Sequence, residues 1–364
     1  MSKVYFVAVE ESEGIQSVRR KLEMLLDESK ILDFIRKDED VAVKIHFGEE
    51  GNVGHVRPEY ARLVSDRIRK RSAKPFFTDT NTLYRGKRTN LEDHKRIAHE
   101  HGFTPDICGA DIVIPDDTNK ANVADVAVNG SFIKTAKVVK LFLDADVIVD
   151  IAHFKGHLMT GFGGALKNIG MGCATIEGKL AQHSDLSPII DTNSCTACME
   201  CAKVCPTDAI YSKGHAVYID SSKCIGCASC IAACTHEGID VDWEAAGDDV
   251  GQKMAEYSSA ILKNKKGKCA FINFAMKITK ECDCLAKDDP RISPDIGIFA
   301  SLDPVAIDKA CFDSVVAACG KDIFKEAHPK RDGIKQLHHA QRIGLGEMDY
   351  DLCVVRIAEA KKTE

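Results

Sequence analysis

Short apolar runs alternate with amphipathic stretches along most of the chain. The runs at 4–9, 41–48 and 75–80 are rich in β-branched and aromatic residues, which favours strands. Between these runs, apolar residues recur at helical spacing over 14–38 and 57–71. Strands that alternate with helices in this way predict an α/β fold, in which a sheet is covered by helices on both faces.

The same alternation continues beyond a central segment that has a different pattern. The further elements predicted are helices over 89–102, 245–263 and 303–319, and strands over 110–117, 145–153, 268–278 and 296–301. Asp303 is a good N-cap for the last helix, and Pro304 suits its first position. Because both flanks look alike, the simplest organisation is one α/β domain interrupted by a smaller unit. Two separate α/β lobes are the alternative.

Cysteine spacing defines the central segment. Eight of the 16 cysteines fall in two runs, CTACMECAKVCP at 195–206 and CIGCASCIAACT at 224–235. Each run has the spacing C-x2-C-x2-C-x3-C, and the runs repeat with a period of 29 residues. In a reducing compartment such cysteines are more often metal ligands than disulfides. The spacing is that of the bacterial two-cluster ferredoxins, which this segment closely resembles.

That spacing predicts two [4Fe–4S] clusters as cofactors. Three thiolates of one run bind a cubane, and the fourth ligand comes from the other run. One cluster would take Cys195, Cys198, Cys201 and Cys234, and the other would take Cys224, Cys227, Cys230 and Cys205. Paired C-x2-C motifs also build zinc sites, but zinc needs only four ligands and rarely uses two such runs.

The residues around the cysteines predict a small ferredoxin-like unit. Short alternating runs at 209–211 and 216–219 suggest a hairpin, and 238–243 would be the matching strand. A unit of this size has almost no core of its own, so bound clusters would hold it together. The predicted domains are an α/β domain formed by 1–186 and 244–364, with the ferredoxin-like unit inserted at 187–243.

Four longer motifs outside the insert point to a known family. They are VKIHFGE (43–49), TDTNTLY (78–84), HFKGHLMTGFGGALKNIGMG (153–172) and DIGIFASLDPVAID (295–308). Over essentially its full length the chain resembles the iron–sulfur proteins grouped as the domain of unknown function numbered three-six-two. The resemblance implies cluster binding and a redox role, and it brings no settled substrate.

Polar residues gather where three of the predicted strands end. Lys44 and His46 belong to the first of these strand ends, Asp79 and Asn81 to the second, and His153, Lys155 and His157 to the third. In parallel sheets ligands bind at the carboxyl ends of strands, so these groups would meet in one cleft. Lys44, His46, Lys155 and His157 are candidates to bind and protonate a small anionic substrate. The alternative is that each is a solvated residue at the start of a loop.

A further metal site is a second hypothesis. Histidines four apart share a face only on a helix, and Gly156 and the preceding strand argue against a helix at His153 and His157. Cys282 and Cys284 form a C-x-C pair that could chelate a metal or act as a redox dithiol, and with His153 the pair would suit a soft metal.

Nucleotide-binding fingerprints fail in the glycine-rich stretch that follows. The pattern G-x-G-x-x-G breaks at Leu166, and the Walker pattern also fails. No dinucleotide or flavin motif is present, although the lack of a motif does not exclude flavin.

Charge and composition narrow the class of protein. The net charge of −6 gives no indication of nucleic-acid binding. No apolar run reaches the length of about 18 residues that spans a membrane, and the start of the chain does not resemble a signal peptide. A cytoplasmic location is therefore expected.

The leading hypothesis is a cytoplasmic iron–sulfur oxidoreductase. It would take electrons from a ferredoxin-type partner and pass them to a small anionic substrate in the α/β cleft. One alternative is an electron carrier or redox-responsive module that acts on a partner protein. Another is a protein that assembles or delivers a metal through Cys282 and Cys284.

Overall fold

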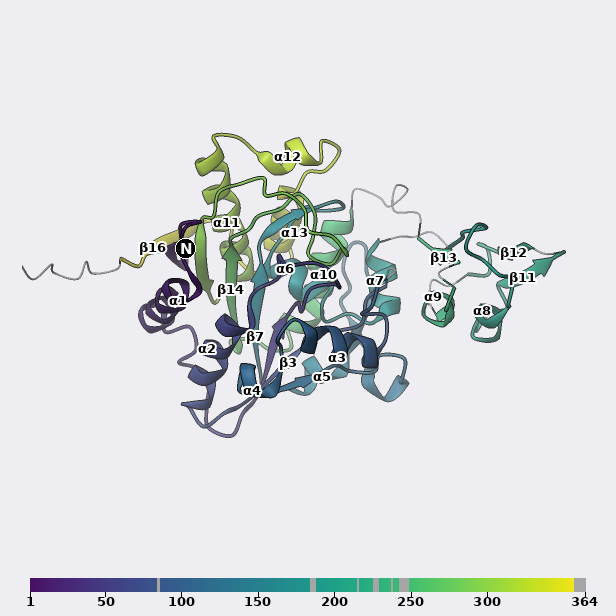
Figure 1. The fold of residues 1–364 in the computed structure, drawn as a ribbon, viewed down its shortest axis with the longest axis horizontal. Coiled ribbons are helices and arrows are strands. Elements are labelled where there is room, and N and C mark those ends of the chain that lie inside the picture. Colours follow the sequence, from purple (N-terminus) through teal and green to yellow (C-terminus); the bar gives the residue numbers. More distant parts are fainter. Residues whose placement is uncertain are drawn as a thin grey trace, which may run out of the picture.

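An eight-stranded sheet forms the centre of the protein (Figure 1). The computed structural model describes residues 1–83, 86–183, 188–214, 216–224, 229–236, 238–241 and 249–356. The strand order is β16-β1-β15-β14-β7-β2-β3-β4. These strands are β1 (Ser2–Ala8), β2 (Asp40–Ile45), β3 (Lys74–Thr78), β4 (Asp111–Val113), β7 (Val147–His153), β14 (Cys269–Ala275), β15 (Gly297–Ser301) and β16 (Tyr350–Val354).

The sheet is mostly parallel. Strands β14, β7, β2, β3 and β4 are neighbours that run in one direction. Only β15 opposes its neighbours within this sheet, since it pairs antiparallel with both β14 and β1. The carboxyl ends of the five parallel strands therefore lie along one edge, where α/β sheets bind ligands.

Helices cover both faces of the sheet, as the sequence predicts. On one face lie α1 (Ile15–Ser29), α2 (Pro58–Arg69) and α4 (Pro105–Cys108), and on the other lie α6 (Ala165–Gly170) and α11 (Pro304–Cys319). Successive side chains of β2 point to opposite faces, as this arrangement requires. Val41, Val43 and Ile45 belong to the hydrophobic core under α1 and α2, whereas Ala42 belongs to the core under α6 and α11. The remaining helices of the domain are α3 (Leu91–Glu100), α5 (Lys140–Asp144), α7 (Ile176–His183), α10 (Val250–Leu262), α12 (Ile323–Ala327), α13 (Ile334–Arg342) and the 3₁₀ turn η1 (Lys120–Asn122).

Several predicted boundaries need correction. The helix expected over 14–38 ends at Ser29, because Lys30 adopts a left-handed conformation (φ 52°) and stops it. The strand expected over 110–117 is only the short β4. The predicted cap at Asp303 is present, since its side chain accepts hydrogen bonds from the backbone of Val305 and Ala306.

Outside the cysteine-rich insert, other strands were not predicted. They are the hairpins β5–β6 (Val123–Ala127 and Thr135–Val139) and β8–β9 (Lys155–His157 and Gly161–Gly163), and the edge strand β16. Strand β8 has the sequence Lys-Gly-His, which carries no apolar alternation, so local pattern could not reveal it.

The cysteine-rich insert forms a small group of elements beside the sheet (Figure 1). Its elements are β10 (Ile189–Ile190), α8 (Glu200–Lys203), β11 (Ile210–Lys213), β12 (Ala216–Ile219), α9 (Ser229–Ala233) and β13 (Ile239–Asp240). Strands β11 and β12 form the predicted hairpin, whereas β13 pairs with β10 instead of extending it. Strands from both flanks of the insert share the eight-stranded sheet. Parts of the predicted elements at 238–243 and 245–263 lie outside the described residues.

Candidate functional site

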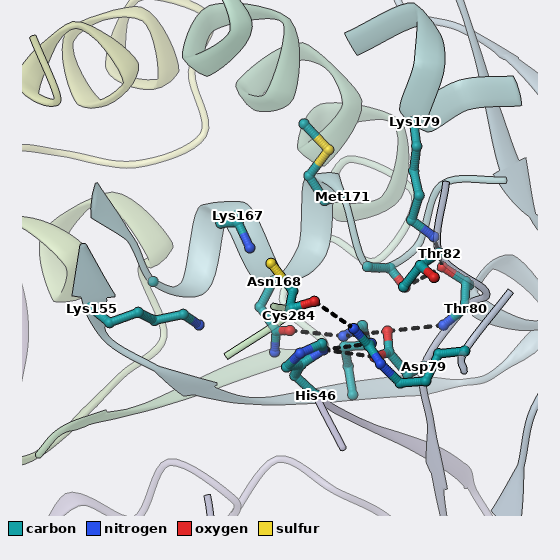
Figure 2. A pocket seen from close by; sticks show the side chains of 14 residues that line it. His46, Asp79, Thr80, Thr82, Lys155, Lys167, Asn168, Met171, Lys179 and Cys284 are labelled. Atoms are coloured by element: carbon teal, nitrogen blue, oxygen red, sulfur yellow. Dashed lines mark hydrogen bonds and ion pairs between the residues drawn. The ribbon is translucent and has the colours of Figure 1, made fainter. Parts of the chain in front are cut away.

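A polar chamber lies at the carboxyl edge of the parallel strands (Figure 2). It is lined by Lys44, His46, Asp79, Thr80, Thr82, Arg88, Lys155, Gly164, Lys167, Asn168, Met171, Gly172, Lys179 and Cys284. In Figure 2 the side chains of Lys155, Lys167 and Lys179 point toward the same space from β8, α6 and α7. The structure thus brings four of the residues predicted at strand ends to one chamber, namely Lys44, His46, Asp79 and Lys155.

Lys44 is buried at the floor of the chamber. Its Nζ lies 3.0 Å from Asp79 Oδ1 and donates to Asn168 Oδ1 at 2.7 Å. A Cβ atom at Gly172, just after α6, would lie 2.2 Å from the Asn168 carbonyl oxygen and 2.4 Å from Lys44 Nζ, so glycine is needed beside the lysine. A buried ammonium requires such close partners, because desolvation without them is costly.

Asp79 and His46 form a second contact across the strand ends. His46 Nδ1 lies 3.1 Å from Asp79 Oδ2. Although burial opposes it, the charge of Lys44 and the hydrogen bond with His46 lower the pKa of Asp79 well below its usual value. Burial, followed by the charge of Arg88, lowers the pKa of His46. At neutral pH these shifts favour an aspartate beside a neutral imidazole.

Asp283 joins three basic groups from different strands. Its carboxylate lies 3.0 Å from Lys155 Nζ, 3.3 Å from His153 Nδ1 and 3.9 Å from His46 Nε2. Burial would raise the pKa of Asp283, but Lys155 and the two histidines lower it well below its usual value. Asp283 therefore anchors the loop after β14 to the ends of β2 and β7.

The two cysteines beside Asp283 belong to a tight turn. The backbone N–H of Leu285 donates to the Cys282 carbonyl at 3.1 Å, and the Cys284 N–H lies 3.4 Å from Cys282 Sγ. Lys167 Nζ donates to Cys282 Sγ at 3.2 Å. Both cysteines are buried free thiols. Burial, and then the neighbouring Cys284, raise the pKa of Cys282 well above its usual value.

A second cavity, here called the vestibule, adjoins the chamber. It is lined by His157, Leu158, Met159, Lys167, Met171, Lys179, His183, Glu281, Cys282, Cys284 and Leu285. Lys167, Met171, Lys179 and Cys284 line both cavities. The vestibule carries leucine and methionine side chains, so it is the less polar of the two spaces.

His157 lies in the vestibule as a neutral hydrogen-bond donor. The backbone N–H groups of Met159 and Thr160 point at its Nδ1 from 3.3 and 3.2 Å. Because Nδ1 accepts, the ring proton belongs on Nε2. Burial, followed by the charge of Lys167, lowers the pKa of His157 well below its usual value.

In the sequence HFKGH, a close backbone contact at Gly156 explains the pattern better than the spacing of two metal-binding histidines does. Its N–H donates to the Thr279 carbonyl at 2.9 Å, and a Cβ there would lie 2.2 Å from the carbonyl oxygen of Lys280. The glycine lets the β8–β9 hairpin touch the chain that leads to Cys282. His153 instead has its ring nitrogens against Asp283 and the Met276 carbonyl, the latter at 2.8 Å.

Lys179 is a chamber residue that sequence reasoning missed. It lies on α7, where its Nζ donates to Thr80 Oγ1 and to the carbonyls of Asn81 and Ala174. Burial lowers the pKa of Lys179 to about 8. Arg88, which pairs with Glu49 at 3.2 Å, was also missed. Neither residue follows a recognisable strand, so only the folded structure reveals them.

Helix α7 separates the chamber from the insert. Ile176 and Leu180 on this helix pack with Leu83 and with Val241 of the insert, and Ile231 of α9 packs against the same group. Lys179, one position from Leu180, faces the chamber instead. A single helix thus contacts both the insert and the chamber.

The cysteines of the insert gather around one small core. Cys201 and Cys230 are buried in it with Ile210, Val217 and Ile239. Cys195, Cys205 and Cys234 pack against the same core. Cys198 is exposed, Cys224 is half-buried, and Cys227 lies outside the described residues.

Backbone amides point at the sulfur atoms of the insert. The N–H groups of Ala209 and Gly238 each donate to the sulfur four residues earlier, Cys205 Sγ and Cys234 Sγ, at 3.2 Å. A Cβ at Gly238 would lie 2.8 Å from the Cα of Cys195, so the two cysteine runs meet there. Amide donors of this kind tune iron–sulfur clusters, so the residues fit the predicted cofactor.

Single-ion metal sites are a separate matter. Within the described ranges, no three or more His, Cys, Asp and Glu side chains are grouped so that they could hold a metal ion. A cubane is a different case, because each of its thiolates binds a different iron. The finding therefore applies to single ions, and it lends no support to the metal hypothesised at Cys282, Cys284 and His153.

These features define a mixed α/β protein with a basic chamber at its strand ends and a cysteine-rich insert. Residues 41–313 match the family described as "Domain of unknown function (DUF362)". The match covers most of the chain, which therefore belongs to the DUF362 family. No curated protein matches it. In the part of the chain that the structure describes, no helix is long and apolar enough to cross a membrane.

Two solved structures are distantly similar. The lactate racemase apoprotein from Thermoanaerobacterium thermosaccharolyticum is 20% identical, with 50% of this chain and 41% of that one covered and a TM-score of 0.35. A structural-genomics protein from Thermotoga maritima is 14% identical, with 86% and 60% covered and a TM-score of 0.41. This chain spans less than two thirds of either protein, and such low similarity says nothing of its function.

Proposed function

We propose that the protein is an iron–sulfur oxidoreductase with two [4Fe–4S] clusters in the insert. It would take electrons from a ferredoxin-type donor and pass them to a small anionic substrate in the chamber. The observation that carries this proposal is the chamber itself, in which four lysines and an arginine converge at the strand ends beside the helix that contacts the insert.

The charge of the chamber favours an anionic ligand. Lys44, Arg88 and Lys155 have carboxylate partners in Asp79, Glu49 and Asp283. Lys167 differs, because its hydrogen bond in the structure goes to the thiol of Cys282. An amino group with so weak an acceptor is the best placed to bind an incoming carboxylate, phosphate or other oxyanion.

Neutral histidines could serve proton transfer at the same place. The Nε2–H of His157 belongs to the vestibule, and the pKa of His46 is lowered by burial within the chamber lining. A buried neutral imidazole donates a hydrogen bond without adding a charge. Lys155 and Lys167 would hold the anion while these groups serve its reduction.

Helix α7 supports an electron path from the insert. Two bound [4Fe–4S] clusters would supply single electrons. The apolar contact of Ile176 and Leu180 with Val241 holds the insert against the same helix that carries Lys179 into the chamber. An electron carrier without a substrate of its own would not need this basic chamber, so the enzyme is the better-supported alternative.

Reoxidation by small anions tests the proposal. The full-length protein is reduced with dithionite, excess reductant is removed, and absorbance is followed while carboxylates, phosphate esters and inorganic oxyanions are added singly. We expect one class to reoxidise the protein, and Lys167→Met to weaken that response at least about tenfold through loss of the anion contact. The exposed Lys134 gives the matched control Lys134→Met. Equal responses of both variants would contradict the assignment of the chamber.

A further inference from the structure

We propose that Cys282 and Cys284 are a redox-active dithiol, which forms a disulfide when it passes two electrons to a substrate bound beside it. This inference rests on the proposed function for its electron donor, but the dithiol can be tested by itself. It assigns a chemical role to two thiols that the anion-binding chamber does not explain.

The turn holds both thiols close together. The hydrogen bond from Leu285 N–H to the Cys282 carbonyl closes a four-residue turn, with the cysteines at its first and third positions. The contact between Cys284 N–H and Cys282 Sγ shows that the first thiol folds back over the turn. A disulfide needs Cα atoms within about 7 Å, which residues two apart in a turn satisfy.

Asp283 fixes the turn in the orientation that this requires. Its side chain makes the ion pairs with Lys155 and His153, whereas both cysteines line the vestibule. The backbone is held as well, because Glu49 N–H donates to the Asp283 carbonyl at 3.1 Å. The aspartate therefore anchors one side of the turn and leaves both sulfurs facing the cavity.

Lys167 gives the pair a cation at the reacting sulfur. Its Nζ lies 3.2 Å from Cys282 Sγ, within reach of the thiolate that forms when a disulfide is cleaved. The same lysine lines both cavities, so an anionic substrate held by it would lie beside the sulfurs. The basic lining also makes the pair a poorer site for a metal cation than for redox chemistry.

The reaction balances as a two-electron, two-proton couple. In reduction, the S–S bond accepts two electrons, one at a time from iron–sulfur donors, and breaks while each sulfur takes up one proton. In reoxidation, the S–S bond forms again, and two electrons and two protons pass to the bound substrate, which leaves as its dihydro product. The dithiol would thus convert single-electron delivery into reduction of a closed-shell organic anion.

Peptide mass analysis tests the inference directly. Cleavage after Lys280 and Lys287 releases 281–287, in which Cys282 and Cys284 are the only cysteines. The native full-length protein is equilibrated anaerobically with oxidised and reduced dithiothreitol, then acid-quenched and alkylated. We expect this peptide to be either doubly alkylated or lighter by two hydrogen atoms, with one two-electron midpoint. Single alkylation throughout the series, or double alkylation under every oxidising buffer, would overturn the proposal.

Variants separate the dithiol from general oxidation. Cys284→Ser should leave Cys282 alkylated once at all potentials, whereas Cys319→Ser, at a partly buried cysteine of α11, should retain the two-electron step. In the reduced protein Lys167→Met should slow alkylation of Cys282 about tenfold. Loss of the lysine charge would raise the pKa of the thiol by about one unit and so lower the fraction of reactive thiolate. Unchanged alkylation in Lys167→Met would remove the lysine from the mechanism.

Iron analysis of the same sample keeps the two proposals distinguishable. A disulfide couple in a protein without iron would leave the dithiol standing and overturn its electron donor. Iron-loaded protein whose thiols never pair would overturn the dithiol and leave the proposed oxidoreductase intact.

Discussion

Asp283 Oδ1 lies 3.0 Å from Lys155 Nζ, and both side chains are buried. This ion pair joins the turn after β14 to the hairpin after β7, two segments that are more than a hundred residues apart in the chain. It is one of several contacts that turn separate strand ends into a single site.

Asp283→Asn should therefore destabilise the protein strongly. Removing one charge of a buried pair leaves the other unpaired, which costs about 3 kcal/mol. Urea unfolding followed by circular dichroism measures the loss. The control is Asp289→Asn, which removes the carboxylate partner of Lys287, a lysine whose side chain is 52% exposed, and should cost less than about 1 kcal/mol. Similar midpoints for the two variants would argue against the anchoring role of Asp283.

Acid should weaken the same anchor. Because the pKa of Asp283 is lowered in the folded protein, its contribution to stability is complete above the pKa of an unfolded aspartate. The contribution is lost as the pH falls through the folded pKa. The difference in unfolding free energy between the wild type and Asp283→Asn should thus shrink below about pH 4, where an unfolded aspartate takes up its proton.

Gly172→Ala should disturb the chamber from its floor. The new Cβ would lie 2.2 Å from the Asn168 carbonyl and 2.4 Å from Lys44 Nζ, so the lysine or the end of α6 must move. Overpacking of this kind costs about 2 kcal/mol. Gly14→Ala is the matched control, because nothing lies within 4 Å of its Cβ. Equal unfolding midpoints for the two variants would show that the chamber accommodates the added methyl group without a loss of stability.

The lowered pKa of Lys179 predicts that the unfolding free energy rises at alkaline pH. Burial lowers its pKa from 10.5 to about 8, so the unfolded chain binds more protons between these values. The unfolding free energy should increase by about 3 kcal/mol as the pH rises from the folded to the unfolded pKa. Lys179→Met should lack this increase, which urea titrations at several pH values can measure. A wild-type profile as flat as that of the variant would contradict the assignment.

The exposed Cys198 offers a mild test of the cluster ligands. Cys198→Ala removes one predicted ligand of a single cluster, so iron should fall by about four atoms per chain. Cys353→Ala, on the edge strand β16, should leave the iron content unchanged. Iron and acid-labile sulfide assays measure both. An unaltered iron content in Cys198→Ala would exclude Cys198 as a ligand.

Local pattern predicts much of this fold and part of its site. The strand-end rule predicted four chamber residues, Lys44, His46, Asp79 and Lys155, because parallel strands that end together bring distant residues to one edge. Strand β7 and helix α11 were also evident, since each carries a long apolar pattern or a clear cap. These features depend on neighbours in the sequence.

Long-range contacts could not be predicted in this way. Nothing near residues 297–301 indicates that β15 runs against its neighbours, because strand direction is set by pairing with β1 and β14. Lys179 and Asp283 likewise owe their roles to partners far away in the chain. The close approach of Gly156 to Lys280 likewise depends on a partner far away in the chain, so the sequence around His153 and His157 could not indicate it.

Our central proposal is that this DUF362 protein binds two [4Fe–4S] clusters that deliver electrons to its chamber. Iron and sulfide analysis of anaerobically purified full-length protein, with EPR of the dithionite-reduced sample, tests it most directly. We predict about eight irons and eight sulfides per chain, with the spectrum of two interacting reduced [4Fe–4S] clusters. Zinc together with an iron content far below this value would contradict the account.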